Sequence, residues 1–254
     1  MYRKHIVAFM DILGFKQLIT NAEQGIDDAM LIINKLTNSI EMVMEENRFL
    51  SDISYRIFSD CICISYDISN VSKERIVCNI QSFLEQIICI QAQLVLEGIF
   101  LRGAICIDNH FENENIIFSQ ALVKAYELES TKALYPRILV DDSVIEYLKK
   151  NNIGNSSLSF EFYGKITRDL DGLNFIDYLD YCSVLGIEYC EDEFLKNHKE
   201  LIESRLRNES DLNVLQKYLW LTRYHNFKVK EEDLSKKYKI GEDFFLFFNK
   251  DVFI

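Results

Sequence analysis

The spacing of apolar residues changes several times along the first half of the chain, and each change predicts a new element. An unbroken apolar run is typical of a buried strand, a spacing of three and four residues of a helix, and alternation of a half-exposed strand. These patterns predict a strand at 5–11, helices at 15–20 and 26–47, a hairpin at 54–59 and 61–66, a helix at 72–96 and a strand at 99–107.

The second half is more polar and its elements are shorter. Its pattern predicts a polar loop at 108–115, a helix at 119–134, a strand at 137–140, a helix at 141–150, strands near 158–163 and 173–178, and helices from 188 onward. The order β-α-α-β-β-α-β-α-β predicts an α+β, ferredoxin-like fold rather than a doubly wound one. We expect one domain over residues 1–186 and a C-terminal helical extension over 187–254 that packs on it.

The composition excludes several classes of protein. Nine glycines and one proline in 254 residues exclude a linker-rich chain, and 48% hydrophobic residues exclude a disordered one. Acidic residues outnumber basic ones by 40 to 28, and the resulting formal charge of −12 argues against a general nucleic-acid binder. No apolar run reaches the ~20 residues of a membrane span, and no secretion signal begins the chain. We therefore expect a cytoplasmic protein without a nucleic-acid or membrane partner.

Most of the seven cysteines lie in apolar runs, which is typical of reduced, buried thiols: Cys61, Cys63, Cys89 and Cys106. The histidines at 110, 198 and 225 lack the spacing of metal ligands, and we interpret them as structural.

Two aspartates form the candidate reactive site. Asp11 follows a buried strand, and Asp60 lies at the tip of the predicted hairpin. In a βαββ unit the first strand lies beside the hairpin, so both carboxylates can converge at one edge of the sheet. Two like charges at close range favour a cation between them, and Mg²⁺ or Mn²⁺ with nucleotide phosphates is the usual solution. The alternative is structural: Asp11 caps a helix and Asp60 is an ordinary turn residue.

The segments around these aspartates resemble class III nucleotidyl cyclases over residues 4–145. The family's first metal motif, a buried strand that runs into Asp-Ile-x-Gly-Phe, matches residues 11–15, and its hairpin aspartate matches Asp60. Ala125 and residues 128–130 fit its Ala-x-x-x-Glu-Ser helix, and residues 136–140 resemble the strand that follows. The resemblance implies a cyclase catalytic core with a ferredoxin-like βαββαβ order.

A narrower resemblance is to the pyrimidine cyclases of the Pycsar anti-phage system. It rests on Phe58-Ser59-Asp60, Leu101-Arg102-Gly103 and Tyr218-Leu219-Trp220, together with the first motif. The resemblance implies conversion of a pyrimidine nucleoside triphosphate, UTP above all, to the cyclic monophosphate and pyrophosphate. A separate effector would read the product during phage infection.

The resemblance also implies how the site is built. Asp11, Asp60 and the backbone carbonyl of Ile12 would hold two Mn²⁺ or Mg²⁺ ions, and Phe15 would lie with the substrate. Class III cyclases pair their sites across a homodimer, with the metals on one chain and the cationic residues on the other.

The chain departs from the purine cyclases at the helix that contacts ribose and triphosphate. The family's Asn and Arg positions fall on Val123 and Glu127. Gln120 and Lys124 have the same spacing of four residues and can substitute for them. The alternative interpretation makes Lys124 a solvated helix residue. Two arginines, Arg102 and Arg137, are further cationic candidates.

Base recognition departs as well. The family's base-reading lysine falls on Arg56 and its acidic partner on Ile116. Arg56 supplies only donors and matches a carbonyl edge, whereas Ile116 cannot accept the amine of adenine. A surface role for Arg56 is the alternative. Two other functions stay open: a purine cyclase, and a catalytically inactive cyclase fold that binds a nucleotide or a partner.

Overall fold

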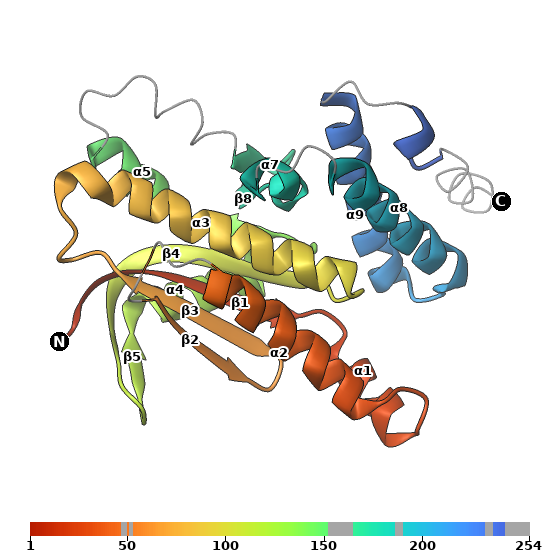
Figure 1. The fold of residues 1–254 in the computed structure, drawn as a ribbon, viewed down its shortest axis with the longest axis horizontal. Helices are drawn as coiled ribbons and strands as arrows, with labels where there is room; N and C mark the ends of the chain where they lie inside the picture. The colour runs from red at the N-terminus through yellow and green to blue at the C-terminus, as the bar shows by residue number, and fades with distance from the viewer. Residues whose placement is uncertain (47–49, 51–52, 152–164, 186–189, 232–235, 242–254) are drawn as a thin grey trace. The chain divides into compact units, whose positions relative to one another are not determined.

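The structure is a computed structural model that describes residues 1–46, 50, 53–151, 165–185, 190–231 and 236–241 (Figure 1). Contacts divide the chain into two compact units, Met1–Val184 and Leu185–Ile254. None of the described helices is long and apolar enough to span a bilayer.

The larger unit contains a sheet of eight strands. They are β1 (Arg3–Ile12), β2 (Ile53–Phe58), β3 (Cys61–Asp67), β4 (Leu101–Glu112), β5 (Ile117–Ser119), β6 (Ile138–Val140), β7 (Ile166–Arg168) and β8 (Asn174–Ile176). The sheet order is β2-β3-β1-β4-β6-β8-β7, and β5 pairs with β4 outside this path. Strand β1 pairs antiparallel with both β3 and β4, so it occupies the centre of the first four strands.

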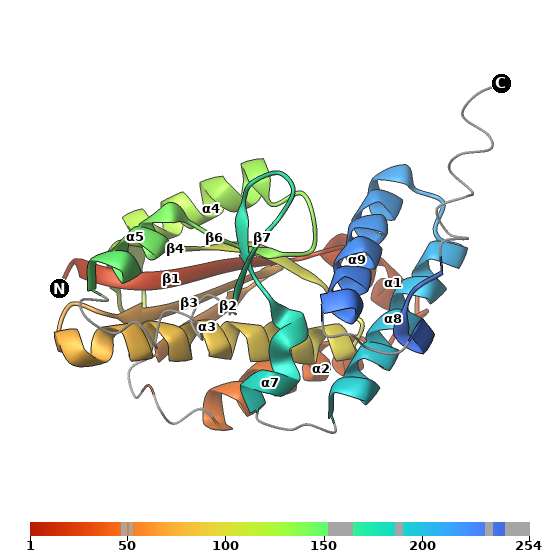
Figure 2. The same cartoon turned by 90° about the horizontal axis from the view of Figure 1, so that it is seen from above.

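Helices cover both faces of this sheet. They are α1 (Phe15–Glu23), α2 (Ala29–Glu46), α3 (Lys73–Leu96), α4 (Gln120–Lys132), α5 (Asp142–Asn151), the 3-10 turn η1 (Tyr178–Asp180) and α7 (Tyr181–Leu185). Helix α3 lies on one face with α2 beside it, and α4 lies on the opposite face against β1 and β4 (Figure 2). Helix α3 buries an apolar stripe that includes Ile80, Phe83 and Ile87, and this stripe forms the core under the sheet.

The connections confirm the predicted fold class. Helices α1 and α2 join β1 to β2, the turn after β2 leads directly into β3, and α3 joins β3 to β4. With the sheet order β2-β3-β1-β4, this is a ferredoxin-like βαββαβ core in an α+β fold.

The pairing of β1 with β4 is unusually close at one position. Gly103 faces Met10 in the register, and a Cβ atom at Gly103 would lie 2.3 Å from the carbonyl oxygen of Phe9. No real Cβ contact is this short, so only glycine allows β4 to pack here. The close approach fixes the position of Arg102, the residue that precedes Gly103 in β4.

Most predicted elements are confirmed, and the differences have local causes. Helix α2 begins at Ala29 rather than at residue 26 because the Asp28 carboxylate accepts from the Met30 and Leu31 amides and caps the helix there. Strand β4 continues through most of the expected loop at 108–115, because β5 pairs back onto it and satisfies its backbone. The predicted strand near 158–163 lies outside the described residues.

The smaller unit is helical, as its charge pattern predicts. It contains α8 (Cys190–Asn208), α9 (Leu212–Glu231) and the 3-10 turn η2 (Lys236–Tyr238). Two buried histidines join its helices: the Nδ1 atoms of His198 and His225 are 3.0 Å apart, and His225 Nε2 is 2.8 Å from the Tyr238 carbonyl oxygen. These contacts agree with a structural role. That this extension packs on the catalytic core stays a prediction.

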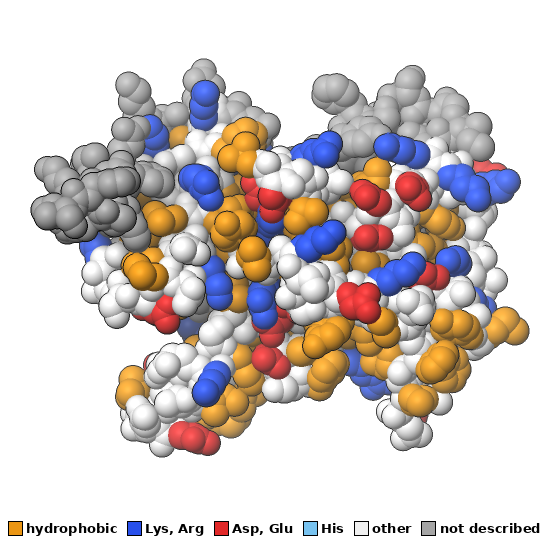
Figure 3. Space-filling view, turned by 180° about the vertical axis from the view of Figure 1, so that it is seen from behind, with side chains coloured by type: hydrophobic (Ala, Val, Ile, Leu, Met, Phe, Trp, Pro, Cys, Tyr) orange, Lys and Arg blue, Asp and Glu red, His pale blue; other side chains and the backbone are white. Residues whose placement is uncertain are grey.

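Figure 3 draws one face of the protein with its charged side chains coloured by sign. On the face drawn in Figure 3, Lys and Arg side chains are interspersed with Asp and Glu and form no continuous basic stripe among the described residues.

Candidate active site

The fold brings Asp11 and Asp60 together at one edge of the central strands. Asp11 lies near the end of β1, directly opposite Cys61 at the start of β3. The Ile12 amide donates to the Asp60 carbonyl oxygen over 2.9 Å and ties the hairpin turn to β1. One ligand atom each from Asp11, Asp60 and Cys61 lie within 4.8 Å of one another. The convergence expected from the βαββ order is therefore present.

The hairpin turn that carries Asp60 has an unusual backbone. Ser59 has φ 55°, in the left-handed region that L-residues other than glycine rarely adopt. Glycine would be the ordinary residue here, and its absence leaves the turn with a modest conformational cost. The Ile12–Asp60 backbone bond holds the turn in this conformation.

Arg102 lies beside both aspartates, as part of β4. Its Nε atom donates a hydrogen bond of 2.8 Å to Asp11 Oδ2. The same Nε atom is also 2.8 Å from Glu129 Oε1 on helix α4. The sequence analysis named Arg102 as a cationic candidate, and the structure places it in contact with Asp11; its catalytic role stays a prediction.

Glu129 is a site residue whose contacts the sequence did not indicate. It follows Ala121 and Ala125 on the face of α4 that packs against the sheet, and its side chain is only 4% exposed. Its Oε1 atom is buried and receives no hydrogen bond from the described residues. A signal was available: a carboxylate at the third position of an otherwise apolar helix face requires a buried partner.

The electrostatics of this cluster favour a cation. Burial raises the pKa of Asp11, and Asp60 adds to the rise, while the hydrogen bond from Arg102 opposes it. Burial also raises the pKa of Glu129, and the charges of Asp11 and Asp60 raise it further against Arg102. Asp11 and Glu129 therefore share one arginine, and the negative charge of this cluster carries a cost that a bound cation would reduce.

The donor atoms fit a hard divalent cation. Two carboxylates and the neighbouring Ile12 carbonyl are oxygen ligands of the kind that Mg²⁺ and Mn²⁺ prefer. Burial and the charges of Asp60 and Asp11 raise the pKa of the free Cys61 thiol to about 12. Mg²⁺ and Mn²⁺ prefer oxygen to sulfur ligands, so the carboxylates are the better donors for these ions.

Arg56 and Ile116 lie close together, away from the two aspartates. Arg56 Nη2 donates to the Asn113 carbonyl oxygen over 3.0 Å. Asn113 and Ile116 close one turn between β4 and β5, because the Asn113 amide donates to the Ile116 carbonyl oxygen over 3.1 Å. The guanidinium and the exposed Ile116 side chain thus belong to one surface region, and their predicted base-binding role stays a prediction.

The predicted pair Gln120 and Lys124 lies near the start of α4, far from Asp11 and Asp60. Lys124 donates to Asp108, which faces His5 in the β1–β4 register. Six residues of strand separate His5 from Asp11, or roughly 20 Å at 3.3 Å per residue. Gln120 is exposed at the start of α4, one turn before Lys124. Within one chain neither residue joins the aspartates, and their catalytic roles stay predictions.

Arg137, the other cationic candidate, has a structural environment. Its side chain is fully buried, and its guanidinium forms ion pairs with Asp169 and Asp171. These aspartates lie in the turn between β7 and β8, and Arg137 directly precedes β6. The ion pairs therefore connect this turn to the start of β6. It is unavailable to a substrate at the Asp11 edge.

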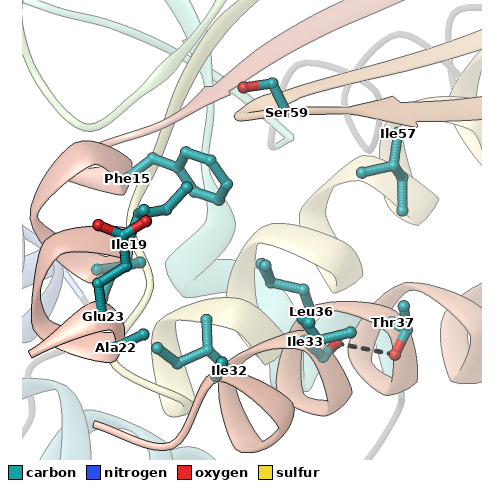
Figure 4. Close-up of a pocket in the computed structure, with 12 residues that line it drawn as sticks. Phe15, Ile19, Ala22, Glu23, Ile32, Ile33, Leu36, Thr37, Ile57 and Ser59 are labelled. Carbon is teal, nitrogen blue, oxygen red and sulfur yellow. Dashed lines mark hydrogen bonds between the residues drawn. The ribbon is translucent and has the colours of Figure 1, made fainter. Parts of the chain in front are cut away.

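Phe15 lines a cavity next to the hairpin. The cavity has a volume of about 460 Å³ and is lined mainly by apolar residues of α1 and α2, with Ile57 and Ser59 from the hairpin. Figure 4 shows Phe15 and Ile57 projecting toward it from opposite sides. The substrate-binding role predicted for Phe15 stays a prediction.

Comparisons with known proteins return solved structures only. No family model and no curated protein matches the chain. The adenylyl cyclase CyaB from P. aeruginosa is similar over 70% of this chain and 95% of its own, at 16% identity and a TM-score of 0.46. The catalytic core of a rhodopsin-guanylyl cyclase with converted specificity, in complex with ATPαS, is similar over 69% and 96%, at 15% identity and 0.45. A bacterial light-regulated adenylyl cyclase is similar over 73% and 98%, at 11% identity and 0.41.

Proposed function

We propose that this protein is a nucleotidyl cyclase that acts on a pyrimidine nucleoside triphosphate, with UTP as the favoured substrate. The observation that carries the proposal is the convergence of Asp11 and Asp60, tied together by the Ile12–Asp60 backbone bond. The family motif that these residues resemble gives both of them to divalent metal ions. The turn role suggested for Asp60 does not account for the second carboxylate within 4.8 Å.

Each residue of the cluster has a defined part in this reaction. The carboxylates of Asp11 and Asp60 and the Ile12 carbonyl would hold Mn²⁺ or Mg²⁺. Bound divalent ions lower the pKa of the ribose 3′-hydroxyl and neutralise the triphosphate. The 3′-hydroxyl would give its proton to water and its oxygen would attack the α-phosphorus. The bond from this phosphorus to the oxygen that bridges the α- and β-phosphates would break, and pyrophosphate would leave with that oxygen. Arg102 supplies positive charge next to the carboxylates.

The proposed preference for uracil rests on Arg56 and Ile116. Arg56 offers donors to a carbonyl edge, and the apolar Ile116 leaves the exocyclic amine of adenine without an acceptor. An unpaired buried donor costs about 1–3 kcal/mol, a bias of roughly tenfold to a hundredfold against ATP. Ile116 lies in the β4–β5 turn, and the Arg56 guanidinium reaches the same turn from β2, which supports a common role.

The proposed active species is a homodimer. Gln120 and Lys124 lie in the first turns of α4, and Lys124 contacts Asp108 far from the aspartates of its own chain, so both would act at the site of a second copy. By the resemblance, the cyclic nucleotide would be a cytoplasmic second messenger in anti-phage defence that a separate effector reads.

One experiment tests the reaction and the base together. The purified protein is incubated with each of the four ribonucleoside triphosphates and Mn²⁺, and the products are identified by mass spectrometry. Cyclic UMP as the main product supports the proposal, and cyclic AMP or GMP would replace it by a purine cyclase. Asp60→Asn is the matched control, because it keeps the shape of the turn residue and removes its charge.

A second candidate function is a cyclase fold that binds a nucleotide without turning it over. Val123 and Glu127 favour it, since neither can act as the family's Asn and Arg. Nucleotide binding by calorimetry without any cyclic product would establish this alternative.

A further inference from the structure

Arg102 and a divalent cation compete for the same carboxylate. Arg102 Nε is 2.8 Å from Asp11 Oδ2, and Asp11 is one of the two aspartates assigned to metal in the proposed function. A cation on Asp11 would place two positive charges on one carboxylate at close range, which is unfavourable in a partly buried site. Arg102 therefore needs another anionic partner when the cation arrives.

Glu129 provides that partner without moving. Its Oε1 atom is at the same 2.8 Å from Arg102 Nε but receives no hydrogen bond, because the N–H points to Asp11. Helix α4 is anchored by the buried Ala121 and Ala125 and is capped by Ser119, whose hydroxyl accepts from the Leu122 amide over 2.9 Å. The Arg102 side chain is 30% exposed, so it is the member of the pair that can turn.

We propose that Glu129 is a positioning residue for the metal site, and that it receives the Arg102 guanidinium when a divalent cation displaces it from Asp11. This inference rests on the metal site of the proposed function. It assigns Arg102 two alternative partners, Asp11 without metal and Glu129 with metal. Glu129 acts through Arg102 and is not itself a ligand of the cation.

A merely structural ion pair would have a different geometry. Arg137 shows that arrangement in the same unit: it is fully enclosed and donates to both of its aspartates. Arg102 instead donates to the functional aspartate and leaves the buried carboxylate without a hydrogen bond. This arrangement is expected of an arginine that can exchange between two carboxylate partners, Asp11 and Glu129.

The test measures Mn²⁺ affinity of the full chain without nucleotide, from the electron paramagnetic resonance signal of free Mn²⁺. Removing the competitor with Arg102→Gln should tighten binding about tenfold, and removing the second partner with Glu129→Gln should weaken it about tenfold. In the double variant the effect of Glu129→Gln should shrink to less than about twofold, because its partner is gone. Glu127→Gln, on the exposed side of the same helix, is the matched control and should leave the affinity unchanged.

Glu129→Asp separates positioning from simple charge. It keeps the negative charge but withdraws the carboxylate from Arg102 by one methylene group, so it should weaken Mn²⁺ binding as Glu129→Gln does. Wild-type affinity in Glu129→Asp, or an equal effect of Glu129→Gln with and without Arg102, would overturn the inference. If Asp11→Asn and Asp60→Asn leave Mn²⁺ binding intact, the metal site of the proposed function itself is wrong. Melting temperatures of all variants establish that they are folded.

Discussion

Two arginines of the same sheet, Arg102 and Arg137, show how one residue type serves two different purposes. Arg137 is fully buried and balanced by Asp169 and Asp171 in a nearby turn. Arg102 is partly exposed and lies among the carboxylates of Asp11, Asp60 and Glu129, which outnumber it. The first environment is closed and complete, whereas the second has unbalanced negative charge that another cation can occupy. The balance of charge around an arginine therefore separates structural from functional ion pairs more clearly than its burial does.

The largest effect is expected when one carboxylate is removed from each environment. Asp11→Asn should reduce cyclisation by about 10³-fold or more, because a metal ligand is worth several kcal/mol in such reactions. The same variant should be at least as stable as the wild type, since burial raises the pKa of Asp11 and makes its charge a cost. Product formation and urea unfolding measure the two properties. Asp169→Asn should show the reverse pattern, and equal losses of activity in both would contradict the comparison.

Loss of each arginine should affect stability unequally. Arg137→Met leaves two aspartates near a buried position without a partner and should lower the free energy of unfolding by about 3 kcal/mol. Arg102→Met should cost less than about 1 kcal/mol, because its partners are partly solvated or take up a proton instead. Urea unfolding curves of the two variants test this difference. A greater loss of unfolding free energy in Arg102→Met than in Arg137→Met would show that Arg102, not Arg137, forms the structural ion pair.

The two environments should respond to pH with opposite signs. The pKa of Glu129 is raised, chiefly by burial, so the cost of its charge is present at neutral pH and is relieved as the pH falls through that raised pKa toward 4.5. Burial opposes the shift at Asp171, but hydrogen bonds from Arg137 and the Leu173 amide lower its pKa, so its stabilising effect is lost as the pH falls below 3.8.

Melting temperatures between pH 7 and pH 3 test these signs. Glu129→Gln should melt no lower than the wild type at pH 7, and any advantage should vanish near pH 4.5. Asp171→Asn should melt lower at pH 7 and approach the wild type in acid. The opposite pH dependence in either variant would contradict the comparison. It would show that the charge of Glu129 stabilises the fold, or that the charge of Asp171 destabilises it.

The smallest expected effect concerns the turn beside the candidate metal site. Ser59→Gly removes the cost of a left-handed serine, about 1–2 kcal/mol, and adds the backbone entropy of glycine, about 0.5–1 kcal/mol. The net gain in stability should be about 1 kcal/mol or less, and Asp60 should become less firmly held. A small rise in melting temperature with a severalfold weaker Mn²⁺ affinity is the expected result. Unchanged affinity would show that the backbone of Ser59 does not help to place Asp60.

Local patterns were sufficient to predict most of the fold. The apolar run of β1 and the alternation of the hairpin each specify their own structure, and together they predict that Asp11 and Asp60 meet. Strand β5 was not predicted because it has only three residues, too few to show a pattern, and it forms by pairing with β4. The start of α2 depends on the Asp28 cap, which the apolar spacing does not register.

The partners of the site residues were harder to predict than the residues themselves. Arg102 and Asp11 are 91 positions apart in sequence, and their contact depends on the register between β1 and β4. Arg137 forms ion pairs with Asp169 and Asp171, and Lys124 forms one with Asp108. The hydrophobic periodicity of the sequence does not identify these aspartates as partners. The sequence analysis identified Glu129 only as part of the Ala-x-x-x-Glu-Ser motif. Its position on an apolar helix face already indicated a buried, positively charged partner.

The tight fit at Gly103 has a consequence for any screen that selects variants by activity. A side chain at this position collides with the β1 backbone, so nearly every substitution would deplete the folded protein and would score as inactive. Arg102, its neighbour, would score as inactive for chemical reasons while its variants accumulate normally. A mutational map based on activity alone would therefore give Gly103 the same rank as Asp11 and Asp60. A parallel measurement of cellular abundance would separate the two, and the positions that lose activity at full abundance would outline the reactive surface directly.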